Sequence, residues 1–225
     1  MTGDLVARWV RIVGEAGRDA AADLIARYRE PHRRYHGVRH LVEVLDAVDE
    51  LAGEAADADA VRLAAWFHDA VYETGAHAAD AADESGGAVT AAAVSNEEAG
   101  ARLAESVLGR LGLAPELVAE TARLVRLTES HTADPWDANA AVLCDADLAV
   151  LAADPARYAQ YAADVREEYR SVPDALFRPG RARILRALLA EPTLFRTSAA
   201  HARHERRARA NVAAELAQLT DSAED

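Results

Sequence analysis

Residues 64–72 read AAWFHDAVY, so a histidine and an aspartate follow directly on a strongly apolar run. Apolar residues at 61, 64, 65 and 67 repeat at helical spacing, which predicts a buried helix that runs into His68-Asp69. A carboxylate in such a setting is costly unless hydrogen bonds, a cation or a metal ion compensate its charge. The stretch therefore predicts a helical core that carries a polar functional site.

A second apolar stretch, AVLCDADLAVL at residues 141–151, contains Asp145 and Asp147. It belongs to residues 137–152, which are predicted to form a buried helix, so these carboxylates also need compensation. Side chains two residues apart on a helix point about 200° apart, so both aspartates cannot face one ion. Imidazole nitrogens and carboxylate oxygens suit Mn, Fe, Co, Ni, Zn or Mg, and the group of residues predicts a divalent metal site.

Helical periodicity recurs along the whole chain, and no alternating strand pattern of useful length appears. Residues 38–48 form one such stripe, and residues 103–111 form another that is expected to end at Gly112. Pro115 and Asp154-Pro155 are predicted helix starts, whereas Pro179-Gly180 is expected to interrupt helical structure. The last helix is predicted over residues 198–219. The fold class is therefore all-α, and residues 1–225 are expected to form a single domain.

The net charge of −13 excludes most proteins that grip long nucleic acid, because these need a basic stripe to displace counterions from phosphates. The basic run at residues 204–209, HERRAR, is interleaved with Glu205 and is interpreted as a solvated or salt-bridged face. A small anionic substrate remains compatible with the charge, since a metal ion and local arginines can attract it.

Cys144 is the only cysteine, which fits a reducing compartment. The first 17 residues include Asp4, Arg8, Arg11 and Glu15 and lack the apolar core of a signal peptide. No uncharged apolar run approaches the ~18 residues of a membrane span. We therefore expect a cytoplasmic protein without membrane contact.

Residues 75–95, GAHAADAADESGGAVTAAAVS, are small and polar and lack a periodic apolar face. They follow the His-Asp pair directly. Two interpretations are open: a disordered surface insertion, or a lid over the site. The next residues, Asn96, Glu97 and Glu98, are expected to return toward the site.

The chain resembles the HD superfamily of metal-dependent phosphohydrolases, named for an H…HD…D pattern. The motif positions match at the end of YHGVRH (residues 35–40), in WFHDAVY (66–72) and in DADLAVL (145–151). Further marks of a family of HD hydrolases of about this length follow in order, including SNEEAGARLA, LTESHT and YAQYAADVREEY. The resemblance implies a helical bundle with one metal ion between its central helices, bound by His40, His68, Asp69 and Asp147.

The resemblance also implies that the metal activates a water for attack at phosphorus. Asp69 would orient that water while it ligates, and Asp145 would support a histidine or arginine beside the site. The expected substrate is a nucleotide or another small phosphorylated metabolite, and the expected state is a monomer or a homodimer. Fold constrains activity only loosely, so two alternatives stay open: a non-catalytic metal-containing ligand sensor, and a di-iron oxygenase that would recruit His36 and His131.

Some members of the superfamily place a glutamate three residues after the HD pair as a general acid or base, whereas this chain has Tyr72 there. Glu97 is therefore a candidate proton carrier. His36, four residues before His40 and predicted to share its helical face, is a candidate catalytic residue, phosphate contact or second-metal ligand. The alternative is a structural partner of Tyr35 or Glu43.

Arg33, Arg34 and Arg166 are candidate phosphate contacts, because guanidinium groups bind phosphate oxygens bidentately. A salt bridge is the alternative for each of them. His131, near an expected helix end, is a candidate for substrate binding, for a second metal or for capping that helix.

Overall fold

The computed structural model describes residues 2–74 and 94–221, and within these ranges it contains helices and no strand. The predicted all-α class is confirmed. The helices are α1 (Thr2–Val13), α2 (Arg18–Arg27), α3 (Val38–Leu51), α4 (Ala58–Phe67), α6 (Asn96–Arg110), α7 (Pro115–Leu127), α8 (Ala138–Asp147), α9 (Pro155–Glu168), α10 (Asp174–Ala190) and α11 (Ser198–Asp221), with 3₁₀ turns η1 (Glu15–Gly17), η2 (Ala52–Glu54) and η3 (Leu148–Ala152).

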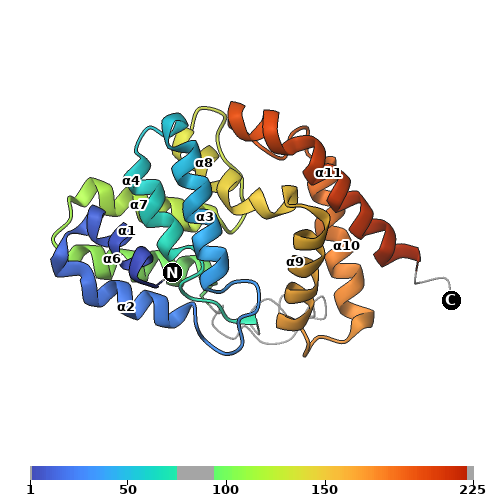
Figure 1. The fold of residues 1–225 in the computed structure, drawn as a ribbon, viewed down its shortest axis with the longest axis horizontal. Helices are drawn as coiled ribbons and strands as arrows, with labels where there is room; N and C mark the ends of the chain where they lie inside the picture. Colours follow the sequence, from blue (N-terminus) through green and yellow to red (C-terminus); the bar gives the residue numbers. More distant parts are fainter. Residues whose placement is uncertain (1, 75–93, 222–225) are drawn as a thin grey trace, which may run out of the picture.

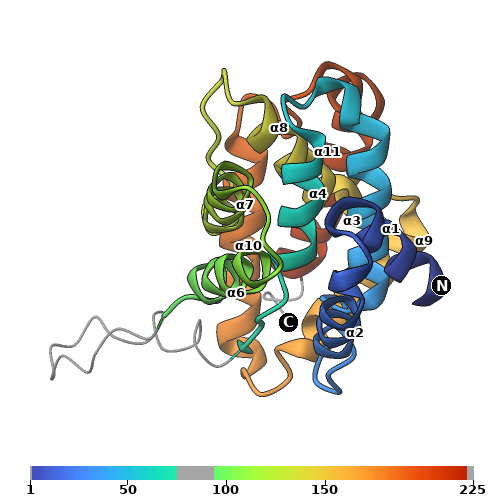
Figure 2. The ribbon, with the colours of Figure 1, turned by 90° about the vertical axis from the view of Figure 1, so that its left-hand side faces the viewer.

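Helix α4 lies at the centre of the molecule. It contacts α3, α6, α7 and α8, and Figure 2 shows it between α7 and α3. Every residue from Leu63 to Phe67 is fully buried, as the apolar sequence predicted. Trp9 of α1 packs its ring edge-on against Trp66 and Phe67, at centroid distances of 5.3 and 5.8 Å. Burial of each such side chain contributes roughly 1.5–3 kcal/mol, so this contact fixes α1 on the core.

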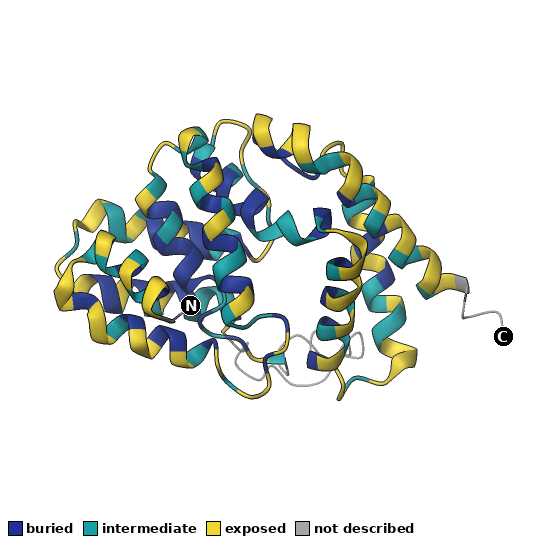
Figure 3. Ribbon diagram, viewed as in Figure 1, coloured by how far each residue is buried: buried dark blue, intermediate teal, exposed yellow. Residues whose placement is uncertain are grey.

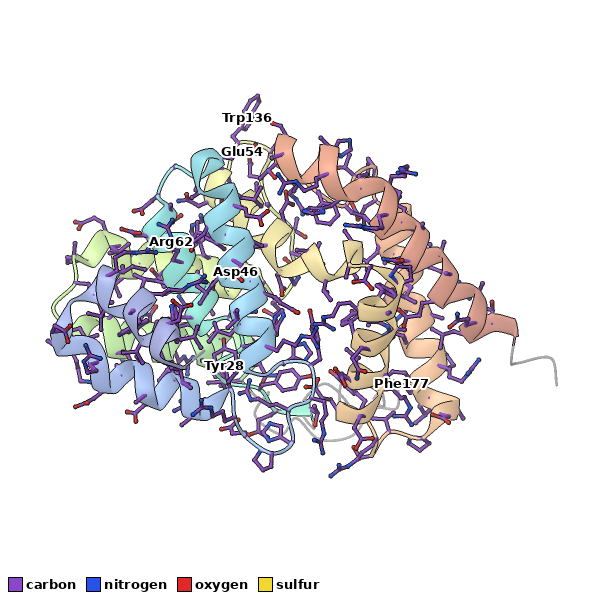
Figure 4. All side chains as sticks on the ribbon, in the orientation of Figure 1. Tyr28, Asp46, Glu54, Arg62, Trp136 and Phe177 are labelled. Carbon is purple, nitrogen blue, oxygen red and sulfur yellow. The ribbon has the colours of Figure 1, made fainter. Side chains whose placement is uncertain are left out.

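The remaining helices, α9 to α11, form a separate group beside the bundle in Figure 1. Helix α8 continues into η3, and both α9 and α11 pack against that turn. Buried residues concentrate on α3, α4 and α8, whereas α9, α10 and α11 expose one face along most of their length (Figure 3). Glu54, labelled in Figure 4 near the start of α11, accepts hydrogen bonds from the backbone N–H groups of Ser198 and Ala199. The bundle thereby caps the last helix.

Local signals set most helix ends. Asp154 caps α9 by accepting from the N–H groups of Ala156 and Arg157, as its position before Pro155 predicted. Gly112 adopts a φ of 75° just after α6, a left-handed conformation that glycine adopts without strain. Residues 137–152 are mostly buried, but the α-helix ends at Asp147 and continues as the 3₁₀ turn η3.

One expected interruption is wrong. Helix α10 runs from Asp174 to Ala190 and passes through Pro179 and Gly180. A proline inside a helix removes one backbone hydrogen bond at a cost of about 3 kcal/mol. Here α10 packs along α11 and buries Ala182 and Leu185, and this tertiary packing overrides the local signal.

The predicted loop at residues 75–95 lies outside the described residues, except for its last two. Ser95 caps α6 by accepting a hydrogen bond from the N–H of Glu98. Among the described residues, no helix combines the length and the apolar character that crossing a membrane requires.

Helix α6 approaches the end of α4 closely at Gly100. A Cβ at this position would lie 2.8 Å from the carbonyl oxygen of Phe67 and 3.3 Å from Val125. We expect Gly100→Ala to destabilise the protein by about 1–3 kcal/mol in urea unfolding, because the backbone before His68 must shift. Gly109→Ala in the same helix is the matched control, since its Cβ would meet nothing within 4 Å. That change should stabilise by about 0.5–1 kcal/mol, and equal losses in both variants would contradict the close approach.

Candidate metal centre

Three packed helices bring the four predicted ligands together. His40 lies in the first turn of α3, His68 and Asp69 directly follow α4, and Asp147 is the last residue of α8. Helix α3 contacts both α4 and α8, and α4 contacts α8. His40 and His68 are buried, and the side chains of Asp69 and Asp147 are each 17% exposed.

The ligand atoms of this cluster face one another. The Nε2 atoms of His40 and His68 lie 3.1 Å apart, and Oδ2 of Asp69 lies 3.2 and 3.1 Å from them. Oδ1 of Asp147 lies 3.1 Å from Nε2 of His40 and 3.6 Å from that of His68. Atoms of His40, His68 and Asp147 fall within 4.8 Å of one another, as a shared metal ion requires.

The chemistry of these donors fits a divalent cation. Nδ1 of His68 lies 2.9 Å from the carbonyl oxygen of Ala65 and donates to it, which leaves the lone pair on Nε2 directed at the cluster. Oδ2 of Asp69 is buried and faces both Nε2 atoms, but within the described part of the chain no contact to it has the geometry of a hydrogen bond. Two imidazole lone pairs and two carboxylates that converge in this way repel one another unless a positive charge lies between them.

The pKa values of the two histidines also indicate that the cluster favours a positive charge. Burial acts to lower the pKa of His40, but its contacts with the carboxylates of Asp147 and Asp69 outweigh this effect, and the pKa is raised. Burial also acts to lower the pKa of His68. The charge of Asp69 and the contact with Asp147 outweigh burial and raise this pKa well above its usual value. The cluster therefore favours a bound cation, whether a proton or a metal.

The two carboxylates are shifted in the opposite direction. Burial acts to raise the pKa of Asp69, but the charges of His68 and His36 hold it well below its usual value. Burial also opposes ionisation of Asp147, and hydrogen bonds from His131, His40 and His68 lower its pKa. Both groups are thus ionised at neutral pH and available as ligands.

Asp147 has a second partner at the edge of the cluster. Its Oδ2 lies 2.8 Å from Nε2 of His131. His131 has a φ of 51°, in the left-handed region that few residues other than glycine occupy. Its carbonyl oxygen accepts a hydrogen bond of 2.6 Å from the Arg196 guanidinium. His131 therefore orients a carboxylate of the cluster through Nε2, while its backbone N–H donates to the carbonyl oxygen of Leu127 at the end of α7.

Asp145 points away from the cluster, as the helical geometry predicted, but its partners differ from the expected histidine or arginine side chain. The carboxylate is 1% exposed and accepts from the backbone N–H groups of Arg196 and Thr197 and from the Thr197 hydroxyl. Burial raises its pKa, against the effect of these hydrogen bonds. Asp145 therefore fixes the segment that leads into α11.

The expectation that His36 shares a helical face with His40 is wrong. Helix α3 begins at Val38, after Gly37 with an extended backbone, so His36 lies in the preceding turn. Its ring still reaches the site, because its centroid lies 5.7 Å from that of His40.

The three candidate arginines are placed differently. Arg33 has a buried guanidinium that donates to the carbonyl oxygens of Asp69, His36 and Ala70, so it supports the backbone of the HD pair instead of facing a substrate. Arg166 binds Asp174 and two carbonyl oxygens and lies over the ring of Phe177. Arg34 is exposed and lies beside His36 in the same turn.

Glu97 lies in the first turn of α6, and its buried Oε2 has no hydrogen-bond partner among the residues that the structure describes. The pKa of Tyr169 is raised, first by burial and in smaller part by the charges of Glu168 and Glu97. Glu97 therefore lies within electrostatic reach of Tyr169, the residue that follows α9.

Sequence reasoning missed Glu168, which contacts His36 and Tyr72 from α9. The only signal was the stretch YAQYAADVREEY, which contains Glu168 but gives no indication of its partner. It also missed the Arg196-Thr197 pair, because no pattern links those residues to α8.

A helical bundle with converging histidine and aspartate ligands defines a class of metal-binding α-helical protein. The family model described as HD domain matches residues 37–154, which include all four predicted ligands. The chain belongs to the HD domain family, whose members are generally metal-dependent phosphohydrolases. Comparison with curated proteins and with solved structures gave no significant match in either case.

Proposed function

We propose that this chain hydrolyses phosphate esters of small phosphorylated compounds, with nucleotides as the leading class, in a reaction that depends on a divalent metal. The observation that carries the proposal is the convergence of ligand atoms from His40, His68 and Asp147, with Oδ2 of Asp69 buried at 3.2 and 3.1 Å from the two imidazole Nε2 atoms. These four residues would hold the ion. Its identity among Mn, Fe, Co, Ni, Mg and Zn is set by geometry and availability.

The ligand set supports catalysis over a purely structural role. On an ion of octahedral geometry such as Mg²⁺, two imidazoles and two carboxylates leave two coordination positions open for water and substrate, whereas a tetrahedral ion with four protein ligands would be closed. A divalent ion at this position supplies a more acidic water and neutralises charge on the phosphoryl oxygens. Asp69 lies between both imidazoles and is the residue that we expect to orient the attacking water.

Neighbouring side chains provide candidates for the other steps. Glu97 has a buried carboxylate oxygen that no described residue hydrogen-bonds, which supports a role in carrying a proton. Arg34 has an exposed side chain next to His36 and is our candidate for contact with a phosphate group. Arg33 and Arg166 are assigned to positioning, because carbonyl and carboxylate oxygens occupy their donors.

A screen of phosphorylated compounds tests the proposal. Protein purified without a histidine tag and supplied with Mn²⁺, Co²⁺, Ni²⁺ or Mg²⁺ should release inorganic phosphate from mononucleotides or related monoesters. Long RNA and DNA should be cleaved little, because a net charge of −13 opposes binding of a long polyanion. Chelator should stop the reaction, and readdition of the metal should restore it.

Three outcomes would contradict the proposal. Processive degradation of a long polymer with mononucleotides untouched would reject the substrate class and leave the metal site intact. Tight binding of nucleotides without turnover by metal-loaded protein would favour a ligand sensor. Two equivalents of iron with oxygen consumption and no phosphate release would favour a di-iron oxygenase, with His36 and His131 as the additional ligands to test.

A further inference from the structure

A second polar cluster lies beside the metal centre and consists of His36, Tyr72 and Glu168. Nδ1 of His36 lies 2.6 Å from Oε2 of Glu168, and the Tyr72 hydroxyl donates to the same oxygen over 3.0 Å. The His36 and Tyr72 rings stack with centroids 4.3 Å apart. His36 and Glu168 both lie outside the residues that match the HD domain, so the family match assigns neither of them.

Glu168 is the organising group of this cluster. Its side chain is fully buried, and its Oε1 accepts from the backbone N–H groups of Arg34, Tyr35 and His36 at 2.7, 2.8 and 2.9 Å. Burial acts to raise the pKa of Glu168. The hydrogen bond from His36, the charge of His36 and the backbone donors outweigh burial and lower the pKa to about 2. The group is therefore a carboxylate, and each of its five contacts is one in which it accepts.

This fixes how His36 is presented. Because a carboxylate only accepts hydrogen bonds, Nδ1 of His36 must carry a hydrogen, and Nε2 is the ring nitrogen that remains available. The His36 ring stacks on Tyr72 and contacts His40 edge-on, with an angle of 78° between the planes of the two histidine rings. The His36 side chain is 22% exposed, so it is partly accessible to solvent next to a predicted metal ligand.

We propose that Glu168 is a positioning residue of the active site, which holds Nδ1 of His36 so that Nε2 contacts the phosphorylated substrate bound at the neighbouring metal centre. This proposal rests on the proposed phosphohydrolase function. It also assigns a role to α9, because the last residue of that helix completes the site from outside the family-matched segment.

The substitution Glu168→Gln tests the assignment with little change in shape. The glutamine oxygen can keep accepting from the backbone of residues 34–36, but its NH₂ group must then face His36. An NH₂ group donates only, so the imidazole has to accept at Nδ1 and carry its hydrogen on Nε2. We expect ¹⁵N-histidine NMR of Zn²⁺-loaded protein to show Nδ1 of His36 protonated in the wild type and unprotonated in the variant, with the His36 signal identified by its loss in His36→Gln.

The functional consequence is measured in the same preparations. Inorganic phosphate should shift the Nε2 resonance of His36 in the wild type, and Glu168→Gln should weaken phosphate affinity about tenfold. Against a monoester, kcat/KM should fall about 100-fold with zinc content unchanged. The double variant Glu168→Gln/His36→Gln should be no slower than His36→Gln, because both changes remove the same contact.

A matched control separates positioning from general stability. Glu215 is another largely buried carboxylate, which binds Arg181 and the Tyr158 hydroxyl between α9, α10 and α11. Glu215→Gln should lower the melting temperature without changing the His36 signal or kcat/KM. A wild-type tautomer in Glu168→Gln, or an additive loss in the double variant, would overturn the proposal.

The NMR measurements also distinguish a failure of the positioning role from a failure of the proposed hydrolase function. If no ester is hydrolysed but the tautomer and the phosphate response change as expected, the function is wrong and the positioning role stands. If Glu168→Gln does not fold, His36→Gln serves instead: it should retain zinc and lose phosphate affinity about tenfold, and unchanged affinity would reject the substrate contact.

Discussion

Replacing His68 by alanine is expected to abolish metal binding and phosphate release together. The residue supplies one of four ligand groups, its Nε2 lies 3.1 Å from both Nε2 of His40 and Oδ2 of Asp69, and its Nδ1 contact with Ala65 holds the ring in place. Alanine leaves three ligands, two of which are carboxylates whose mutual repulsion is then offset less well. Asp69→Ala should have the same effect, since it removes the carboxylate between the imidazoles.

Elemental analysis of protein purified with Mn²⁺ or Fe²⁺ measures this effect. The wild type should carry close to one equivalent, and each variant should fall below about a tenth, with activity reduced at least about 1000-fold. His201→Ala is the matched control, because that histidine lies on α11 with its side chain 50% exposed. A double variant His68→Ala/Asp69→Ala that retained a full equivalent of metal would reject the ligand assignment.

The helices were predictable because their signals are local. Asp154 before Pro155 and Gly112 after α6 determine backbone conformation through groups within a few residues. The same holds for the opposite directions of Asp145 and Asp147, which follow from helical geometry alone. Pro179 was misread because packing against α11 and the core, which a local window does not contain, carries α10 through it.

The site was only partly predictable, for the same physical reason. The buried setting of His68-Asp69 and Asp147 is visible in apolar flanks, so their need for compensation can be read from the sequence. The pairing of His36 with Glu168 joins residues separated by 132 positions, and periodicity carries no information about it. Arg33 has the composition of a phosphate contact, but its burial against the carbonyl oxygens of the HD pair depends on the folded turn before α3.

Asp145 and Asp147 provide the sharpest comparison between metal binding and stability. Asp147→Asn should lose the metal, because its Oδ1 faces both imidazoles and its Oδ2 receives His131. An amide supplies no negative charge and can present only one oxygen. Phosphate release should then fall at least about 1000-fold, as for the other ligands.

Asp145→Asn should retain the metal and lose about 10–100-fold in activity. Its NH₂ group cannot accept from the N–H groups of Arg196 and Thr197, so about 1–3 kcal/mol of stability should be lost. The Arg196 segment also holds the His131 carbonyl, which explains how a change remote from the ion reaches Asp147.

Thermal unfolding with and without Mn²⁺ distinguishes the two aspartates directly. A metal that binds only the folded state raises the melting temperature, so the size of that rise reports binding. Asp147→Asn should abolish the rise, whereas Asp145→Asn should lower the melting temperature of both forms and preserve the difference between them. The reverse pattern would mean that Asp145 binds the metal and that the direction of these two side chains on α8 is wrong.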